Sequence, residues 1–190
     1  MSAKPRWVLP VVLIAMIATV SVGIVARQLY FEPEPLPPAA VLPSESEIPD
    51  SAQPGDPTVA PVEDAAQHPL YPEVRATLQT YFDAINAKDY DRWRRAVTRR
   101  FAAEYGRDQW RDDYRSTRDG SIVVWRIETG LPGTARVLIS FTSTQDPRDG
   151  THELPDADCV RWRLVYAFLY EDDVWRLDKG LLGSTLTEAC

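Results

Sequence analysis

The side chains that could carry out chemistry are few and far apart in this chain of 190 residues. Its only histidines are His68 and His152, both in segments expected to be loops, whereas a zinc site needs three or four ligands at workable spacing. Neither Cys159 nor Cys190 has a histidine near it in sequence, so the pairing of a thiol with a base is not indicated. We therefore expect no metal, no cofactor and no catalytic residue.

Helical spacing of apolar residues predicts the elements that come first. Tyr71–Ala87 is predicted to be a helix, and Tyr90–Ala103 a second one with Trp93 facing inward. A short polar helix at Asp108–Thr117 is expected to follow. The apolar face of the first helix consists of Val74, Leu78, Tyr81, Phe82 and Ile85.

The second half of the chain alternates in the way that strands do. Strands are predicted at Ser121–Glu128 and Thr134–Thr144, and Cys159–Leu182 has the pattern of a hairpin of two long strands. Helices followed by four antiparallel strands indicate an α+β domain with helices on one sheet face. One face of the first hairpin strand is strongly aromatic and consists of Val160, Trp162, Leu164, Tyr166, Phe168 and Tyr170.

A known pattern occurs where the first two helices meet. Tyr81-Phe82-x-Ala84-Ile85-Asn86-Ala87-x-Asp89-Tyr90-Asp91 resembles the opening of the nuclear transport factor 2-like superfamily, which includes ketosteroid isomerases and polyketide cyclases. Val174-Trp175-Arg176-Leu177 is similar to the last strand of that fold. The resemblance covers about residues 68–182. It implies a cone, with N-terminal helices in the concave face of a curved antiparallel sheet and a pocket at the wide end.

The isomerase branch of that superfamily can be compared residue by residue. Tyr81 matches the tyrosine that donates to the oxyanion, but the positions of the two carboxylates fall on Tyr105 and Tyr166. Two of three roles are missing, so the resemblance implies a ligand pocket without catalysis. The candidate pocket residues are Tyr81, Trp93, Tyr105, Trp162, Tyr166 and Phe168.

The expected interior is apolar, with tyrosine hydroxyls as its main polar groups and no ionised acid–base pair. The outer strand face, with Arg161, Arg163 and Arg176, is the expected docking surface for an envelope protein or for a homodimer through the sheet. The side chains expected around the interior are Leu78, Tyr81, Phe82, Trp93, Trp162, Leu164, Tyr166, Phe168 and Trp175.

The N-terminal part predicts a membrane anchor. Val8–Val25 is an uncharged run of 18 residues, which as a helix would span roughly 27 Å. A cleaved secretory signal is the alternative, but its apolar region is usually about 7–15 residues long. Lys4 and Arg6 precede the run, so the positive-inside rule places residues 1–7 in the cytoplasm, a transmembrane anchor at 8–30 and the remainder outside.

Residues 31–67 are predicted to be a disordered linker, because they contain nine prolines, eight acids and no base. The folded domain is then expected at 68–190. That domain has 18 basic and 20 acidic residues and is close to neutral. The net charge of −7 belongs mostly to the linker and argues against a nucleic-acid partner.

Cys159 and Cys190 are expected to form a disulfide, because an exported domain meets an oxidising environment and the cysteine count is even. Free or intermolecular thiols are the alternative. The expected function is a non-catalytic, membrane-anchored binding or assembly module of the cell envelope that can hold a hydrophobic small ligand. The alternative is a small-molecule isomerase- or cyclase-type enzyme that uses Tyr81.

Overall fold

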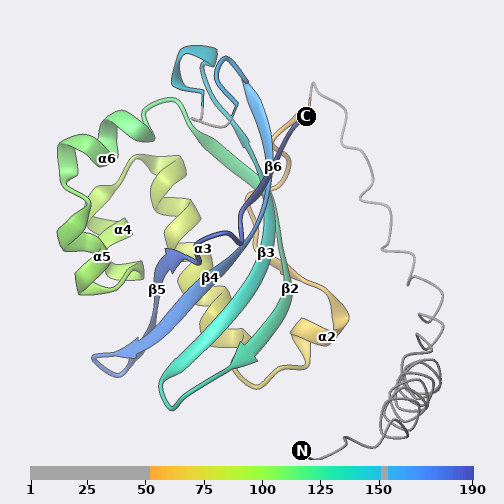
Figure 1. Ribbon diagram of the computed structural model, residues 1–190, viewed down its shortest axis with the longest axis vertical. Coiled ribbons are helices and arrows are strands. Elements are labelled where there is room, and N and C mark those ends of the chain that lie inside the picture. Colours follow the sequence, from red (N-terminus) through yellow and green to blue (C-terminus); the bar gives the residue numbers. More distant parts are fainter. Residues whose placement is uncertain (1–51, 151–153) are drawn as a thin grey trace, which may run out of the picture. The chain divides into compact units, whose positions relative to one another are not determined.

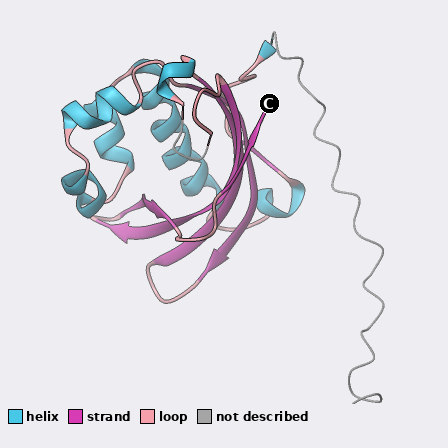
Figure 2. Ribbon diagram, turned by 45° about the horizontal axis from the view of Figure 1, so that its top comes forward, coloured by secondary structure: helices cyan, strands magenta, loops and turns pink. Residues whose placement is uncertain are grey.

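A curved sheet wraps around a group of helices in the computed structural model, which describes residues 52–150 and 154–190 (Figure 1). The strand order is β1-β2-β3-β4-β5 with β6 paired to β4, and every pair is antiparallel except β1 with β2. Helices α3 to α6 lie on the concave side of the sheet (Figure 2). The predicted α+β class, with helices packed against a curved sheet, is confirmed. The elements are β1 (Ala60–Pro61), α2 (Glu63–Ala66), α3 (Tyr71–Ala87), α4 (Tyr90–Ala96), α5 (Arg99–Glu104), α6 (Arg107–Asp113), β2 (Arg118–Thr129), β3 (Thr134–Thr144), the 3₁₀ turn η2 (Pro147–Asp149), β4 (Cys159–Glu171), β5 (Val174–Gly180) and β6 (Leu186–Ala189).

Helix α3 turns its apolar face toward the sheet. Its predicted inward residues, from Val74 to Ile85, are all buried. The helix ends at Lys88, which takes a left-handed conformation with φ of 58°. Asp89 then begins α4, because its side chain accepts a hydrogen bond from the backbone N–H of Arg92 at 2.9 Å.

The second predicted helix is broken into α4 and α5. Val97 is extended and forms an isolated bridge with Leu177 of β5, while the N–H of Thr98 donates to the Leu177 carbonyl at 2.9 Å. Thr98 also caps α5 through its hydroxyl, which accepts from the Phe101 N–H at 3.1 Å. The β-branched pair Val97-Thr98 therefore joins the helices to the edge of the sheet.

The folded part begins earlier than the predicted boundary at residue 68. β1 pairs with β2, and the Val62 N–H donates to the Val124 carbonyl at 3.0 Å. Val59 is fully enclosed, and its N–H donates to the Gln79 side chain of α3 at 2.9 Å. Proline content predicts a linker here, but Val59 and Ala65 are buried and Val62 is partly buried against the core. A β-carbon on Gly120 would lie 2.5 Å from the Gly55 carbonyl oxygen, so this close approach requires glycine.

Strand β2 contains irregularities that bend it. Its pairing with β3 shifts between Gly120 and Val123 and again between Val124 and Arg126, and Ser121 has φ of 50°. Bulges of this kind bend a strand and increase its twist. They contribute to the curvature with which the sheet encloses the helices (Figure 1).

The core contains most of the side chains expected around the interior. Trp162 and Trp175 are only half-buried, and the other seven are buried. The prediction that Arg176 belongs to an exposed docking surface is wrong. Its side chain is 18% exposed and donates to the Arg95 carbonyl of α4 at 2.6 Å, so it faces the helices rather than a partner. Arg161 and Arg163 are half-buried residues of β4.

Several predictions concern residues outside the described part of the chain. The predicted cytoplasmic segment 1–7, the anchor at 8–30 and the linker up to residue 51 fall there, as does His152. Among residues 52–150 and 154–190, no helix is long and apolar enough to cross a membrane.

Candidate ligand pocket

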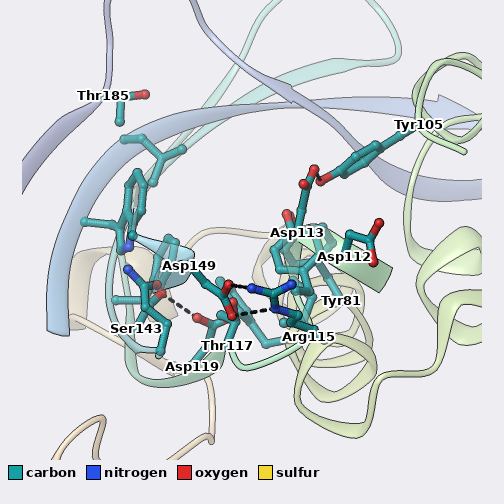
Figure 3. Close-up of a pocket in the computed structure, with 18 of the residues that line it drawn as sticks. Tyr81, Tyr105, Asp112, Asp113, Arg115, Thr117, Asp119, Ser143, Asp149 and Thr185 are labelled. Carbon is teal, nitrogen blue, oxygen red and sulfur yellow. Dashed lines mark hydrogen bonds and ion pairs between the residues drawn. The ribbon is translucent and has the colours of Figure 1, made fainter. Parts of the chain in front are cut away.

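A cavity of about 740 Å³ opens between the helices and the concave face of the sheet. Figure 3 shows that its polar side chains come from the helices, from β2 and β3 and from the loops around them. Its apolar walls come from α3, β3 and β4. The lining residues are Tyr81, Phe82, Ile85, Tyr105, Asp112, Asp113, Tyr114, Arg115, Thr117, Asp119, Phe141, Ser143, Gln145, Asp149, Gly150, Trp162, Leu164, Tyr166 and Thr185.

Three tyrosines form the aromatic interior of the cavity. The hydroxyl oxygens of Tyr81 and Tyr114 are 3.5 Å apart, and the ring centroids of Tyr81 and Tyr166 are 6.0 Å apart with edge-to-face geometry. Burial raises the pKa of all three hydroxyls above the usual value for tyrosine. They are therefore neutral at physiological pH and can both donate and accept hydrogen bonds.

Asp119 adds a buried carboxyl group to this interior. Its residue is 3% exposed, and the Ser143 hydroxyl donates to its carboxylate at 2.5 Å. Its backbone is fixed by Asn86 of α3, which exchanges two hydrogen bonds of 2.8 and 2.9 Å with the residue 119 amide and carbonyl. Burial raises the pKa of Asp119 to about 6, against the opposing effects of Ser143 and Lys88. The interior was expected to have tyrosine hydroxyls as its main polar groups, and the buried carboxyl group of Asp119 is an addition that this expectation did not include.

The bulge in β2 explains why Asp119 points inward. Asp119 is paired with Ser143, and Val124 with Ile139, and both partners face the interior. Without an extra residue between them, positions 119 and 124 would lie on opposite faces, because their separation is odd. The bulge after Gly120 reverses that alternation. The only sequence signal for the inward-pointing Asp119 is that this acidic residue directly precedes a glycine, Gly120, near the start of the strand.

The rim of the cavity carries charge. The Arg115 guanidinium forms an ion pair with Asp149, with its Nε 2.9 Å from a carboxylate oxygen, and the Ser116 hydroxyl donates to the same carboxylate at 2.5 Å. The hydrogen bond from Arg115 lowers the pKa of Asp149. Asp113 accepts a hydrogen bond from the Tyr105 hydroxyl. Two exposed acids on α6, Asp112 and Asp113, thus lie beside an arginine that already has a carboxylate partner.

The structure brings four of the six predicted pocket residues to the cavity: Tyr81, Tyr105, Trp162 and Tyr166. It places Trp93 and Phe168 in the solid core, each with 0% exposure. Trp93 packs among aromatic rings of the helices, with centroids 5.5 Å from Tyr90 and 5.7 Å from Tyr105. The spacing that marked these two residues as inward-facing does not distinguish a cavity wall from the core.

Chemically, the cavity combines neutral hydroxyl donors with a carboxyl group that changes charge near neutral pH. It can therefore bind a polar or charged group at the Asp119 end and an apolar body along the aromatic walls. In the described part of the chain, no group of three or more His, Cys, Asp and Glu residues is arranged to hold a metal ion.

The predicted disulfide between Cys159 and Cys190 is confirmed. It joins the start of β4 to the residue after β6, with the two Cα atoms 5.4 Å apart. The Cys190 N–H also donates to the Cys159 carbonyl at 3.2 Å. The bridge lies at one end of the sheet, where β6 pairs with residues 160–163 of β4.

Comparisons with known proteins give a partial structural match. No protein-family model and no curated protein sequence matches the chain. One solved structure to which it is similar is an uncharacterised protein with a cystatin-like fold from Caulobacter vibrioides. The two are 17% identical, the match covers 57% of this chain and 84% of that chain, and the TM-score is 0.42.

These findings correct the family resemblance inferred from the sequence. No family model supports the resemblance, and the solved structure to which the chain is similar is described as having a cystatin-like fold. The aromatic spacing of Tyr81-Phe82 and the residues after it identifies a helix buried against a sheet, and several folds require such a helix. The structure supports the coarser part of the prediction, an α+β arrangement with helices packed on a curved sheet.

Proposed function

We propose that the folded domain is a non-catalytic binding module that holds a small molecule in its cavity. The observation that carries this proposal is the cavity itself. Its volume of about 740 Å³ is within the usual range for ligand sites, and aromatic side chains dominate its walls. A few polar groups, from Tyr81, Tyr166 and Asp119, converge at one end to fix the orientation of a ligand.

The second part of the proposal is that this module is displayed outside the cytoplasm. Structural disulfides persist in oxidising compartments, and the domain has one between Cys159 and Cys190. The uncharged run Val8–Val25 and the basic residues before it favour the same location. An envelope protein is the proposed partner of such a module, and the half-buried outer face of β4 is the surface available for it.

The binding function can be tested with a neutral fluorescent probe, N-phenyl-1-naphthylamine, titrated into the full-length chain. We expect saturable binding at one site. Thr185 is exposed and lines the cavity, so Thr185→Trp should obstruct the cavity and weaken binding about ten-fold. Thr129→Trp, at the exposed end of β2 and away from the cavity, is the matched control and should bind normally. Equal loss in both variants, or no saturable binding at all, would contradict the proposal.

A second candidate is supported by Asp119. A carboxyl group with a pKa of about 6 in the same cavity as the Tyr81 hydroxyl could act as a general base for proton transfer. This is the isomerase- or cyclase-type alternative, now based on the cavity and not on family resemblance. The probe is 2-tetralone in D₂O, whose protons beside the carbonyl exchange in a way that NMR can follow. Exchange faster than in buffer, and lost in Asp119→Asn, would favour the enzyme; exchange at the buffer rate would favour the binding module.

A further inference from the structure

The charges around the cavity are mostly negative. Its lining includes four carboxyl groups, those of Asp112, Asp113, Asp119 and Asp149, but only one guanidinium, that of Arg115. Arg115 is already engaged by the Asp149 carboxylate. The remaining three acids therefore face the cavity without a lining cation of their own.

Lys88 is the other cation near the deepest of these acids. Its ammonium group donates to the Thr117 carbonyl, and its charge opposes the effect of burial on Asp119. Burial in turn lowers the pKa of Lys88. The other titratable groups around Asp119 are the tyrosine hydroxyls of Tyr81, Tyr114 and Tyr166, which are neutral. Even with Lys88 included, the charge around the cavity remains negative.

The cavity walls are rich in aromatic rings, which also attract positive charge. Seven of the lining side chains are aromatic: Tyr81, Phe82, Tyr105, Tyr114, Phe141, Trp162 and Tyr166. The face of an aromatic ring carries partial negative charge and attracts cations, most strongly where water is excluded. Trp162 and Phe141 stack in parallel, with centroids 5.9 Å apart, and the cavity adjoins both. Aromatic walls ending in a buried carboxylate fit a cationic head group on an apolar body.

We propose that the cavity binds an organic cation, either a protonated amine or a quaternary ammonium ion carried on an apolar body. This inference rests on the proposed binding function and names the chemical class of its ligand. The carboxylate of Asp119 neutralises the head group, and the acids of α6 attract it to the mouth of the cavity. An anionic ligand would meet three carboxylates, and a neutral one would leave the Asp119 charge uncompensated.

The test uses three ligands with the same aromatic body and different charge: naphthylmethyl-trimethylammonium, naphthalenemethanol and naphthylacetate. Each is titrated by calorimetry into the full-length chain at pH 7.5. We expect the cation to bind at least about ten-fold more tightly than the alcohol, and the anion to bind least. If the alcohol or the anion binds as tightly as the cation, the inference is overturned while the binding function stands. If none of the three binds, the binding function fails as well.

Variants separate the charge of Asp119 from its shape. Asp119→Asn keeps a hydrogen-bond acceptor for Ser143, so it should lower cation affinity about ten-fold and leave alcohol affinity unchanged. Binding of the alcohol also shows that the variant is folded. Asp108→Asn, an exposed acid on the same helix as Asp112 but outside the cavity, is the matched control and should change neither affinity. Loss of cation binding in both variants, or in neither, would overturn the inference.

The pH dependence offers an independent measurement. Asp119 gains a proton as the pH falls through about 6, so cation affinity should decline from pH 7.5 to pH 5 while alcohol affinity stays constant. Because a bound cation favours the ionised carboxyl, binding at pH 6 should release protons, which appears as a buffer-dependent heat. A cation affinity that is the same at both pH values would count against Asp119 as the partner of the head group.

Discussion

The carboxyl group of Asp119 is buried among aromatic rings, with a neutral hydroxyl as a hydrogen-bond donor. Its pKa is about 6 in the folded protein and about 3.9 in an unfolded chain, so the folded state binds more protons between these values. The free energy of unfolding therefore falls as the pH rises through this window. At neutral pH the ionised Asp119 destabilises the fold, which is typical of a residue retained for binding or chemistry.

The first prediction is that Asp119→Asn stabilises the protein at pH 7.5 by about 2 kcal/mol, since it removes a buried charge and keeps an acceptor for Ser143. At pH 4 and below, where wild-type Asp119 is protonated, the gain should disappear. Urea denaturation of both proteins at the two pH values measures this difference. A gain of the same size at pH 4 would show that the cause is not the charge.

Asp178 provides the opposite control, because it is a buried acid with a full set of partners. Its carboxylate accepts a hydrogen bond from the Thr98 hydroxyl at 2.9 Å and pairs with the Arg100 guanidinium. These contacts hold the start of α5 on β5. Asp178→Asn should therefore lower the free energy of unfolding at pH 7.5 by about 1–3 kcal/mol. If both aspartate variants shifted stability in the same direction, the contrast drawn between their surroundings would be wrong.

The second prediction concerns Tyr81, whose hydroxyl lies at the long distance of 3.5 Å from that of Tyr114. Tyr81→Phe keeps the ring and its edge contacts with Phe82 and Tyr166, so the free energy of unfolding should change by no more than about 1 kcal/mol. Ligand affinity should change modestly, as for a binding site. Loss of a turnover that wild type possesses, measured with the 2-tetralone exchange assay, would instead identify Tyr81 as part of an enzyme.

At the residue level, the sequence predicted side chains that follow a simple period. Tyr81 and Tyr166 were expected near one interior and line the same cavity. Asp119 was missed because a bulge inverts the alternation of β2, and a bulge depends on how two strands pair rather than on a short sequence pattern. Trp93 and Trp162 were both expected at the pocket, yet only Trp162 reaches it, because periodicity does not reveal where packing leaves a space.

At the level of elements, the long helices and strands were predictable and the short ones were not. β3 was expected at Thr134–Thr144 and is found there, since eleven alternating residues give a strong signal. β1 and β6 are two and four residues long, too short for a period to emerge. The break at Val97-Thr98 arises from pairing with β5, a tertiary contact that overrides helical spacing.

The third prediction addresses the attachment of β6. The disulfide closes a loop between positions 31 apart in sequence, which restricts the unfolded chain and should contribute roughly 3–4 kcal/mol. Cys159→Ser should lower the free energy of unfolding by that order and speed amide exchange of residues 186–189. Thermal and urea unfolding, with exchange followed by NMR, measure both effects.

The control for this experiment is Cys190→Ser, together with the double variant. All three proteins lack the same bond, so they should be equally destabilised. A double variant clearly more stable than either single one would indicate that a free thiol, and not the lost bond, causes the defect. Strong destabilisation with unchanged exchange in β6 would show that the bridge acts elsewhere than on this strand.

For the whole molecule, the order of elements was enough to predict the class of fold. Helices followed by antiparallel strands must bury the helices against one sheet face, and the structure has this arrangement. The family could not be predicted from the same residues, because spacing such as that of Tyr81, Phe82 and Ile85 follows from burial of any amphipathic helix. Ordered structure before residue 68 was not predicted, because the prolines of this segment were weighed above Val59, which is buried, and Val62, which is partly buried against the core.

The last prediction is the orientation of the chain in a membrane. Lys4 and Arg6 before the uncharged run Val8–Val25 favour a cytoplasmic N-terminus, and the Cys159–Cys190 disulfide favours an oxidising location for the domain. Protease added to intact protoplasts should therefore release a fragment containing the folded domain, while a cytoplasmic marker protein stays intact. If the domain were cut only after the membrane is lysed, the proposed orientation would be wrong. If the domain were already free of the membrane fraction before protease, the uncharged run would be acting as a cleaved signal instead of an anchor.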